Sequence, residues 1–419
     1  MLLIKGGRLI DPLSGTDDVL DILIDGENVV KIDKGIEGDC QVIDANGLIV
    51  SPGFMDIHSH FRDPGQTHKE DIYTGAKAAA AGGYTTVICM ANTSPVVDNV
   101  DTLNRIVDRA KSADIEVMQV AAITKGLRGE ELTDFKALIE AGAVGFSDDG
   151  RGILNPRIAL EAMEAAKDLN VVLSFHEEDI RLIENPGVNY GPAAEKLGLK
   201  GARREAEEVL VARDAILALN TGARIHIQHV SSALSVDIIR WAKGMGAHIT
   251  AEATPHHFSL TEDAVGELCT YAKMNPPLRT ENDRLAIIGG LKDGTIDAIA
   301  TDHAPHTTEE KDAPFATAPS GIIGLETALA VGMTYLVRPG RLSINELLSR
   351  LTIGPARIYS LDRGYIKEGH RADIAIFDPD EVWQVNGFHS RSANSPFTGA
   401  SLVGKVKTTI YKGKIIYEG

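Results

Sequence analysis

Alternating strand-like and helix-like segments between residues 54 and 301 constrain the fold most strongly. Eight short apolar runs occur in this region, and a helical pattern or a long loop follows each of them. The predicted strands cover residues 54–58, 84–90, 115–121, 143–147, 171–175, 225–229, 248–252 and 296–301. The predicted helices cover residues 69–81, 100–112, 131–141, 157–169, 202–219 and 233–244. This pattern predicts an α/β fold of the (β/α)8 TIM-barrel type. A doubly wound open sheet is the alternative, which the strand count and the lack of a GxGxxG turn disfavour.

Two β-rich segments flank this region. Residues 1–50 contain short strands separated by turns such as Asp25-Gly26 and Asn46-Gly47, and the segment after residue 362 has a similar pattern. Because chain termini often lie close together, we expect both segments to form one small β-sandwich. The predicted domains are therefore a β-sandwich of residues 1–51 and 362–419 and a barrel of residues 52–361.

Charge and cysteine content exclude some classes of protein. The net charge of −17 disfavours nucleic-acid binding but is compatible with a small anionic substrate, since local cations can override the global sign. The three cysteines, Cys40, Cys89 and Cys269, have no CxxC spacing, which is typical of a reducing compartment. The sequence contains no run of 18 apolar residues, so no membrane span is predicted. The expected location is cytoplasmic, without a membrane or nucleic-acid partner.

The first predicted barrel strand ends in a His-x-His-x-Arg motif, formed by His58, His60 and Arg62. Residues two apart on a strand point to the same side, so the two imidazoles lie side by side, as a metal site requires. Arg62 adds a cation that can bind an anionic substrate. Two histidines can also fall together by chance at a strand edge, so the other strand ends decide between these interpretations.

Further metal-ligand residue types follow four later strands of the predicted barrel. His176, His229 and Asp302 each follow a strand, and the pair Asp148-Asp149 follows another. In a barrel of this type, residues at the carboxyl ends of the strands converge on one mouth. Four histidines and two aspartates there suit two divalent ions of the zinc type. Two ions require a bridging ligand, which is either Asp148 or Asp149, because adjacent residues face opposite ways.

Several motifs resemble those of the amidohydrolase superfamily, and within it the bacterial type I dihydroorotases. The motifs are PGFMDIHSHFR at residues 52–62, MANT at 90–93, FSDDG at 146–150, HVSS at 229–232, NPPLR at 275–279 and TDHAPH at 301–306. They occur in the family's order along almost the whole chain. The resemblance implies a (β/α)8 barrel with a small β-sandwich from both termini, in agreement with the pattern above.

The resemblance also implies a metal centre with two Zn²⁺ ions, although other divalent metals remain open. His58, His60 and Asp302 would bind one ion, His176 and His229 the other, and Asp149 would bridge them. Asp302 would be the catalytic residue that takes a proton from the attacking water and delivers it to the leaving nitrogen. The implied reaction is the reversible cyclisation of N-carbamoyl-L-aspartate to L-dihydroorotate in de novo pyrimidine biosynthesis.

Substrate-binding residues are implied in the same way. Arg62 can form a bidentate pair with a carboxylate. By resemblance, His60, Asn92 and His306 also bind the substrate, and Asn275 with the Ser320-Gly321 backbone contacts its ring. The family often has Phe-Gly where this chain has Ser320-Gly321, so the packing of the ring can differ. The polar segment of residues 303–320 is either a mobile lid or a solvated loop.

Three rival functions remain from the sequence. A hydantoinase or allantoinase is disfavoured because many such enzymes use a carboxylated lysine where Asp149 stands. A mononuclear deaminase needs a Glu soon after the sixth-strand histidine, where this chain has Val230-Ser231-Ser232. A non-catalytic scaffold is disfavoured because all six ligand positions are present. A homodimer and an aspartate transcarbamoylase partner remain open.

Overall fold

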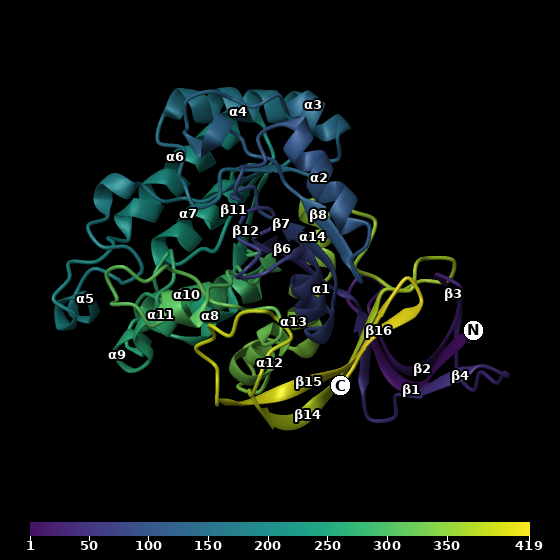
Figure 1. Cartoon of the computed structure of the whole chain (residues 1–419). Coiled ribbons are helices and arrows are strands. Elements are labelled where there is room, and N and C mark those ends of the chain that lie inside the picture. The colour runs from purple at the N-terminus through teal and green to yellow at the C-terminus, as the bar shows by residue number, and fades with distance from the viewer.

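A computed structural model describes residues 1–419 except the side chain of Leu268. Its centre is a ring of eight parallel strands with helices around it (Figure 1). These strands are β6 (Phe54–Ser59), β7 (Tyr84–Cys89), β8 (Glu116–Gln119), β9 (Phe146–Ser147), β10 (Leu173–Phe175), β11 (Ile225–Ile227), β12 (Ile249–Ala253) and β13 (Ala298–Ile299). Each strand lies within one of the eight predicted ranges or extends past it by only one residue.

Two β-bridges close the ring. Strands β6, β7 and β8 form one parallel sheet, and β9 to β13 form a second. Bridges from Ala121 to Phe146 and from Ser59 to His303 join these sheets at their two edges. At the second junction, the His60 N–H donates a 2.9 Å hydrogen bond to the His303 carbonyl. The predicted (β/α)8 barrel is therefore confirmed, and the open doubly wound sheet is wrong.

Helices follow most barrel strands, and the predicted ones begin and end near the expected residues. The helices are α1 (Ile72–Ala81), α2 (Val100–Ala110), α3 (Phe135–Glu140), α4 (Pro156–Asp168), α5 (Pro192–Lys196), α6 (Glu205–Thr221), α7 (Ala233–Gly244), α8 (Pro255–Ser259), α9 (Ala264–Leu268), α10 (Glu281–Asp293), α11 (Thr308–Lys311), α12 (Ala328–Gly332), α13 (Ile344–Leu351) and α14 (Ile353–Ile358). Short helical turns are η1 (Lys125–Leu127), η2 (Ile180–Leu182), η3 (Cys269–Ala272) and η4 (Met333–Val337). Capping boxes fix several starts; Asp71, for example, accepts the Thr74 N–H at the start of α1.

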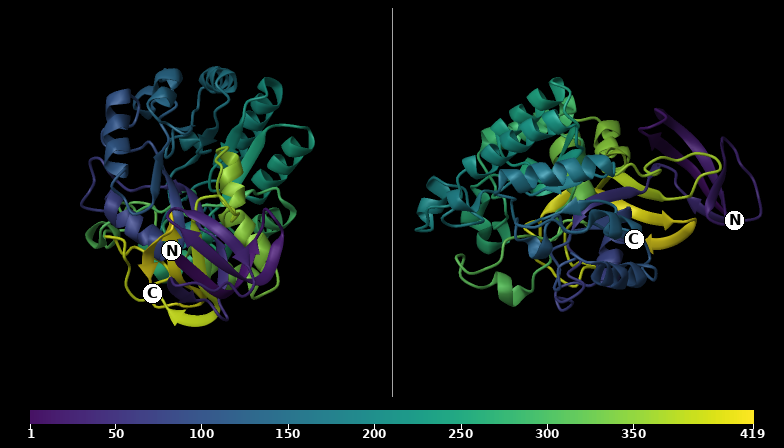
Figure 2. Two further views of the ribbon diagram at one scale, coloured as in Figure 1. Left: turned by 90° about the vertical axis from the view of Figure 1, so that its right-hand side faces the viewer. Right: turned by 90° about the horizontal axis from the view of Figure 1, so that it is seen from above.

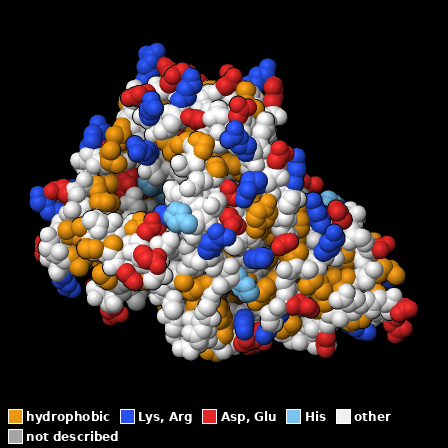
Figure 3. Space-filling model, in the orientation of Figure 1, with side chains coloured by type: hydrophobic (Ala, Val, Ile, Leu, Met, Phe, Trp, Pro, Cys, Tyr) orange, Lys and Arg blue, Asp and Glu red, His pale blue; other side chains and the backbone are white. Residues whose placement is uncertain are grey.

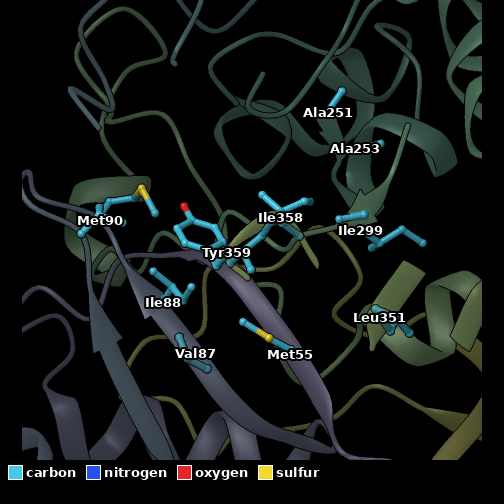
Figure 4. Packing of buried hydrophobic residues seen from close by; sticks show 14 of the residues in the cluster. Met55, Val87, Ile88, Met90, Ala251, Ala253, Ile299, Leu351, Ile358 and Tyr359 are labelled. Carbon is cyan, nitrogen blue, oxygen red and sulfur yellow. The ribbon is translucent and has the colours of Figure 1, made fainter. Parts of the chain in front are cut away.

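The main hydrophobic core joins the barrel strands to the last helices. Met55 from β6 and Val87 from β7 lie near Leu351 of α13 and Ile358 of α14 (Figure 4). These side chains are almost completely buried, so each contributes on the order of 1.5–3 kcal/mol of transfer free energy. This packing holds the strands in register, and so fixes where their carboxyl ends lie.

Both ends of the chain form one eight-stranded sheet beside the barrel (Figures 1 and 2). Its strands are β1 (Leu2–Asp11), β2 (Thr16–Asp25), β3 (Asn28–Asp33), β4 (Gln41–Asp44), β5 (Ile49–Pro52), β14 (Ile374–Gln384), β15 (Ser401–Tyr411) and β16 (Lys414–Glu418). The two ends meet where β5 pairs with β14 in antiparallel orientation. The predicted association of the termini is confirmed, while the exact domain boundaries stay a prediction.

The connection between β14 and β15 leaves this sheet and reaches the barrel. Ser390 and Arg391 bond to Glu70, and Asn394 bonds to the backbone that follows β13. The β-rich unit therefore contributes residues next to the barrel mouth.

Among the described residues, no helix is both long enough and apolar enough to cross a bilayer.

Candidate active site

The predicted metal ligands lie at the ends of their strands, and two of them have strained backbones. His229 and Asp302, together with the predicted substrate residue Arg62, have positive φ values of 31°, 47° and 58°. Such values are costly for residues other than glycine and persist where the surrounding structure enforces them. The strain turns the chain sharply at these strand ends, as is common in functional sites.

The six predicted ligands come together in one buried cluster around Asp149. The Asp149 carboxylate lies 3.2 Å from His58 Nε2, 3.5 Å from both His60 Nε2 and His176 Nδ1, and 3.8 Å from His229 Nε2. On the other side of the cluster, Asp302 Oδ1 is 3.0 Å from His60 Nε2. One carboxylate therefore touches all four imidazoles, as the bridging role requires.

Asp148 points away from this cluster. Its carboxylate accepts a 3.0 Å hydrogen bond from the Thr124 N–H and a second bond from the Thr124 hydroxyl. Burial raises the pKa of Asp148 to about 6, which these hydrogen bonds only partly oppose. The geometry thus separates two adjacent aspartates that the residue pattern alone left open, and it favours Asp149 as the bridge.

Hydrogen bonds on the outer side of the cluster direct imidazole lone pairs inward. A carboxylate or amide oxygen can only accept, so His58 Nδ1–H donates to Glu252 at 2.5 Å and His60 Nδ1–H donates to Asn92 at 3.0 Å. His176 Nε2–H donates to Glu178 at 3.3 Å. The opposite nitrogen of each ring then carries a lone pair that faces the carboxylates. This arrangement is usual for metal-binding histidines.

One of these lone pairs, on His58, has no hydrogen-bond donor in the described part of the chain, and another, on His176, meets only a second imidazole. His58 Nε2 is buried without a hydrogen-bond partner among the described residues, and His176 Nδ1 faces His229 Nε2 at 2.8 Å. Two groups of side chains, His58 with Asp149 and His229, and His58 with His60 and Asp302, have ligand atoms within 4.8 Å of one another. Nitrogen and carboxylate donors in this arrangement fit divalent cations.

The charges in the cluster favour cations. Burial opposes the protonated form of His58, but the negative charges of Glu252 and Asp149 outweigh it and raise the pKa of His58 well above its usual value. Burial would raise the pKa of Asp302, but the neighbouring His60 imidazole and the positive charge of His58 lower it to about 2. The same negative field that stabilises a protonated imidazole also stabilises a bound metal cation.

Glu252 and Glu178 are functional candidates that the sequence analysis missed. Glu252 is on β12 and is fully buried; one oxygen accepts the His58 N–H, and the other accepts the His226 N–H at 3.0 Å. Its carboxylate also accepts the His229 backbone N–H at 3.2 Å. The sequence contained one sign of this role: Glu252 is an acidic residue at the end of the seventh predicted strand, where burying a charge without a partner costs free energy.

Replacing Glu252 with Gln is expected to weaken metal binding by about 10–100-fold, the usual effect of losing such a partner. Glutamine keeps the shape but removes the charge that orients His58. Competition with a chelator, followed by metal analysis, measures this change. The matched control is E164Q, at an exposed position on α4. Equal metal retention by E252Q and the control would contradict the role given to Glu252.

A cavity of about 190 Å³ opens over the cluster. It is lined by His60, Arg62, Asn92, Asp149, Gly150, His176, His229, Asn275, Asp302, Ala304, His306, Ser320 and Gly321. Every predicted site residue lines this cavity except His58, which is completely buried next to Asp149. Figure 3 shows histidine side chains in and beside a hollow on this face of the molecule.

Arg62 is the cation of this cavity. Its Nε donates to the Pro305 carbonyl at 3.3 Å, and the guanidinium forms no salt bridge with a carboxylate among the described residues. Burial lowers the pKa of Arg62, although Asp302 and Asp149 oppose this effect. A half-buried guanidinium without a paired carboxylate is suited to an anionic ligand.

His306 lies beside Arg62 and is neutral. Burial, followed by the positive charges of Arg62 and Lys69, lowers the pKa of His306 to about 2. Lys69 Nζ lies 3.5 Å from Nδ1, and Nε2–H donates to the Ser320 carbonyl at 2.9 Å. The Ser320 carbonyl can only accept, so this bond places the ring proton on Nε2 and connects His306 to the Ser320-Gly321 segment.

The remaining predicted substrate residues differ in their free hydrogen-bonding groups. Asn92 bonds His60 and also donates to Asp149 at 3.0 Å, so it supports the metal centre as well as lining the cavity. Asn275 Nδ2 donates to Glu178 at 2.6 Å, which leaves Oδ1 without a partner among the described residues. The Gly321 N–H donates to the Lys273 carbonyl, so this amide is already engaged within the protein.

Comparisons with known proteins agree with this site. A family model described as dihydro-orotase-like matches residues 47–235, and one described as amidohydrolase family matches residues 299–417. A dihydroorotase of Clostridium acetobutylicum is 63% identical and one of Clostridioides difficile 57% identical, each over all of both chains. The solved L-hydantoinase of Arthrobacter aurescens has a TM-score of 0.88 at 24% identity, covering 100% of this chain and 96% of its own.

The fold and the histidine–carboxylate site define a metal-dependent amidohydrolase. Among these enzymes, the hydantoinase resembles this chain in fold, and the dihydroorotases resemble it closely in sequence. The solved hydantoinase shares the fold alone, whereas the two dihydroorotases are 63% and 57% identical over the whole chain. The chain belongs to the dihydroorotase family.

Proposed function

We propose that this chain catalyses the reversible interconversion of N-carbamoyl-L-aspartate and L-dihydroorotate in de novo pyrimidine biosynthesis. The observation that carries the proposal is the single cavity in which Arg62 stands beside the histidine–carboxylate cluster. Dihydroorotate is a cyclic amide with a carboxylate on its ring, so it requires both a hydrolytic centre and an anion-binding group. The full-length relatives named dihydroorotase support the same activity.

The proposed cofactor is a pair of Zn²⁺ ions. His58, His60 and Asp302 would hold one ion, His176 and His229 the other, and Asp149 would contact both, in line with its position among the four imidazoles. When bound, such ions polarise an amide carbonyl and lower the pKa of water toward about 7. Other divalent metals with nitrogen and oxygen preferences would fit the same donors.

Asp302 is proposed to transfer the proton. In hydrolysis, the carbonyl carbon gains an oxygen from water and loses its bond to the ring nitrogen. The Asp302 carboxylate accepts the proton from the attacking water and then donates it to the departing nitrogen, so it serves first as base and then as acid. In the reverse direction the ring closes and water leaves. The Asp302 carboxylate lies at the cavity wall, beside His60.

The other cavity residues are proposed to orient the substrate. Arg62 would form a bidentate pair with the ring carboxylate, with neutral His306 and Asn92 beside it. His60 would contact the substrate as well as the metal. Elsewhere in the cavity lining, the free Asn275 Oδ1 can accept a ring N–H. The Ser320-Gly321 segment would pack against the ring, with its polar backbone atoms largely held by the protein.

Substrate preference and metal content test the proposal together. The zinc-loaded protein is expected to hydrolyse dihydroorotate far faster than hydantoin or allantoin, because only dihydroorotate carries the carboxylate that Arg62 would bind. Metal analysis of the same sample is expected to give two equivalents of metal per chain. Clear preference for hydantoin or allantoin would overturn the substrate assignment, and one equivalent would overturn the binuclear centre.

We also propose that the enzyme is cytoplasmic, in keeping with its few, unpaired cysteines. A homodimer and a complex with an aspartate transcarbamoylase stay predictions. Gel filtration of the protein alone, and then mixed with the transcarbamoylase, measures both.

A further inference from the structure

A segment of the terminal sheet reaches the wall of the substrate cavity. It comprises residues 385–400, which connect β14 to β15, and its innermost polar side chain is Asn394, with 2% of its surface exposed. Asn394 is distant in sequence from the barrel mouth, and no motif marked it.

Asn394 connects two separate stretches of the cavity wall. Its Oδ1 accepts the His306 backbone N–H at 3.0 Å, while its Nδ2 donates to the carbonyls of Ala304 at 3.1 Å and Gly321 at 3.2 Å. Its own carbonyl accepts the Ile323 N–H at 3.1 Å. Both side-chain donor hydrogens are therefore used, one for each stretch, and Ala304, His306 and Gly321 all line the cavity.

Lys311 reaches the same carbonyl. Its Nζ donates to Gly321 at 3.0 Å and to Pro319 at 3.1 Å, and the residue is fully buried with no carboxylate partner among the described residues. Burying a lysine costs free energy, which its hydrogen bonds to these two carbonyls partly offset. Gly321 is thus held by two side chains, one from the terminal sheet and one from α11.

We infer that Asn394 is a positioning residue, which sets the spacing between His306 and Gly321 on the substrate-binding wall. The inference rests on the proposed function, because that wall is where the ring carboxylate and the ring would bind. The hydrogen bonds of Asn394 go to this wall and not to the histidine–carboxylate cluster. Its loss is therefore expected to alter substrate binding far more than the chemical step.

The test uses N394D and N394A in the full-length, zinc-loaded enzyme. N394D keeps an acceptor for the His306 N–H but loses both donors, and N394A loses all three side-chain bonds. Both are expected to raise KM for dihydroorotate by about tenfold with kcat changed less than about threefold. The inhibition constant of orotate, which has the same ring carboxylate, is expected to rise by a similar factor. The control is N386A, an exposed asparagine of the same segment.

An unchanged KM in both variants, or a fall in kcat at constant KM, would overturn the inference. Should both variants fail to fold, K311M tests the same wall by removing the other donor to Gly321, and it too is expected to raise KM. A normal KM for folded K311M would then overturn the inference. If the wild type hydrolyses hydantoin rather than dihydroorotate, the proposed function fails. The variants are then measured with hydantoin, and an unchanged KM overturns the positioning role separately.

Discussion

Replacing Asp302 with Asn is expected to lower kcat for dihydroorotate by about 10³-fold, within the range that general acid–base groups contribute. Asparagine has nearly the same shape but can neither accept nor deliver the proton. The strained backbone at Asp302, with φ of 47°, suits Asn, which tolerates positive φ better than most residues. The fold should therefore persist. Steady-state kinetics measures kcat, thermal unfolding measures the stability of the fold, and metal analysis of the same sample measures how much metal is retained.

The control for this substitution is D312N, which changes an exposed aspartate directly after α11. Its kcat and melting temperature are expected to match the wild type. If D302N retained metal and kept kcat within tenfold of the wild type, Asp302 would not be the proton carrier.

Replacing Arg62 with Met is expected to raise KM for dihydroorotate by about 100-fold, because the substrate carboxylate loses a charge-assisted hydrogen-bonded pair. Methionine retains much of the apolar stem but none of the charge. The change in kcat should be much smaller, since Arg62 would bind a part of the substrate that is not transformed. Kinetics in both directions, with dihydroorotate and with N-carbamoyl-aspartate, measure this separation.

R105M, at an exposed position on α2, controls for the loss of one positive charge from the protein. Its KM is expected to stay at the wild-type value. A wild-type KM in R62M would remove Arg62 from the binding site, and equal losses in R62M and R105M would point to general electrostatics.

The sequence predicted the barrel because its signals are local. Period-two spacing places His58, in β6, and His60, directly after β6, on the same side of the chain, and apolar runs located all eight strands. The runs overestimated some strands: β9 and β13 have two residues each, within predicted ranges of five and six. Strand assignment requires paired hydrogen bonds, whereas apolar character continues into the flanking loops.

The residues that support the site could not be predicted in this way. Glu252 meets His58 across 194 positions of sequence, and Asn394 meets His306 across 88. Each such role depends on which strands become neighbours and which way a loop returns, so neither leaves a short-range pattern. The residue pattern could not choose between Asp148 and Asp149 for the same reason. Asp148 is held away from the cluster by a hydrogen bond from Thr124, a residue that follows a different strand.

The bridge between Ser59 and His303 joins the first and last strands of the ring, directly beside His60 and Asp302. A growing polypeptide therefore has only part of its ligand set until the eighth strand has been made and has docked onto the first. High-affinity metal uptake would then mark the end of barrel assembly. The rate of zinc binding during refolding would then report the rate at which the ring closes.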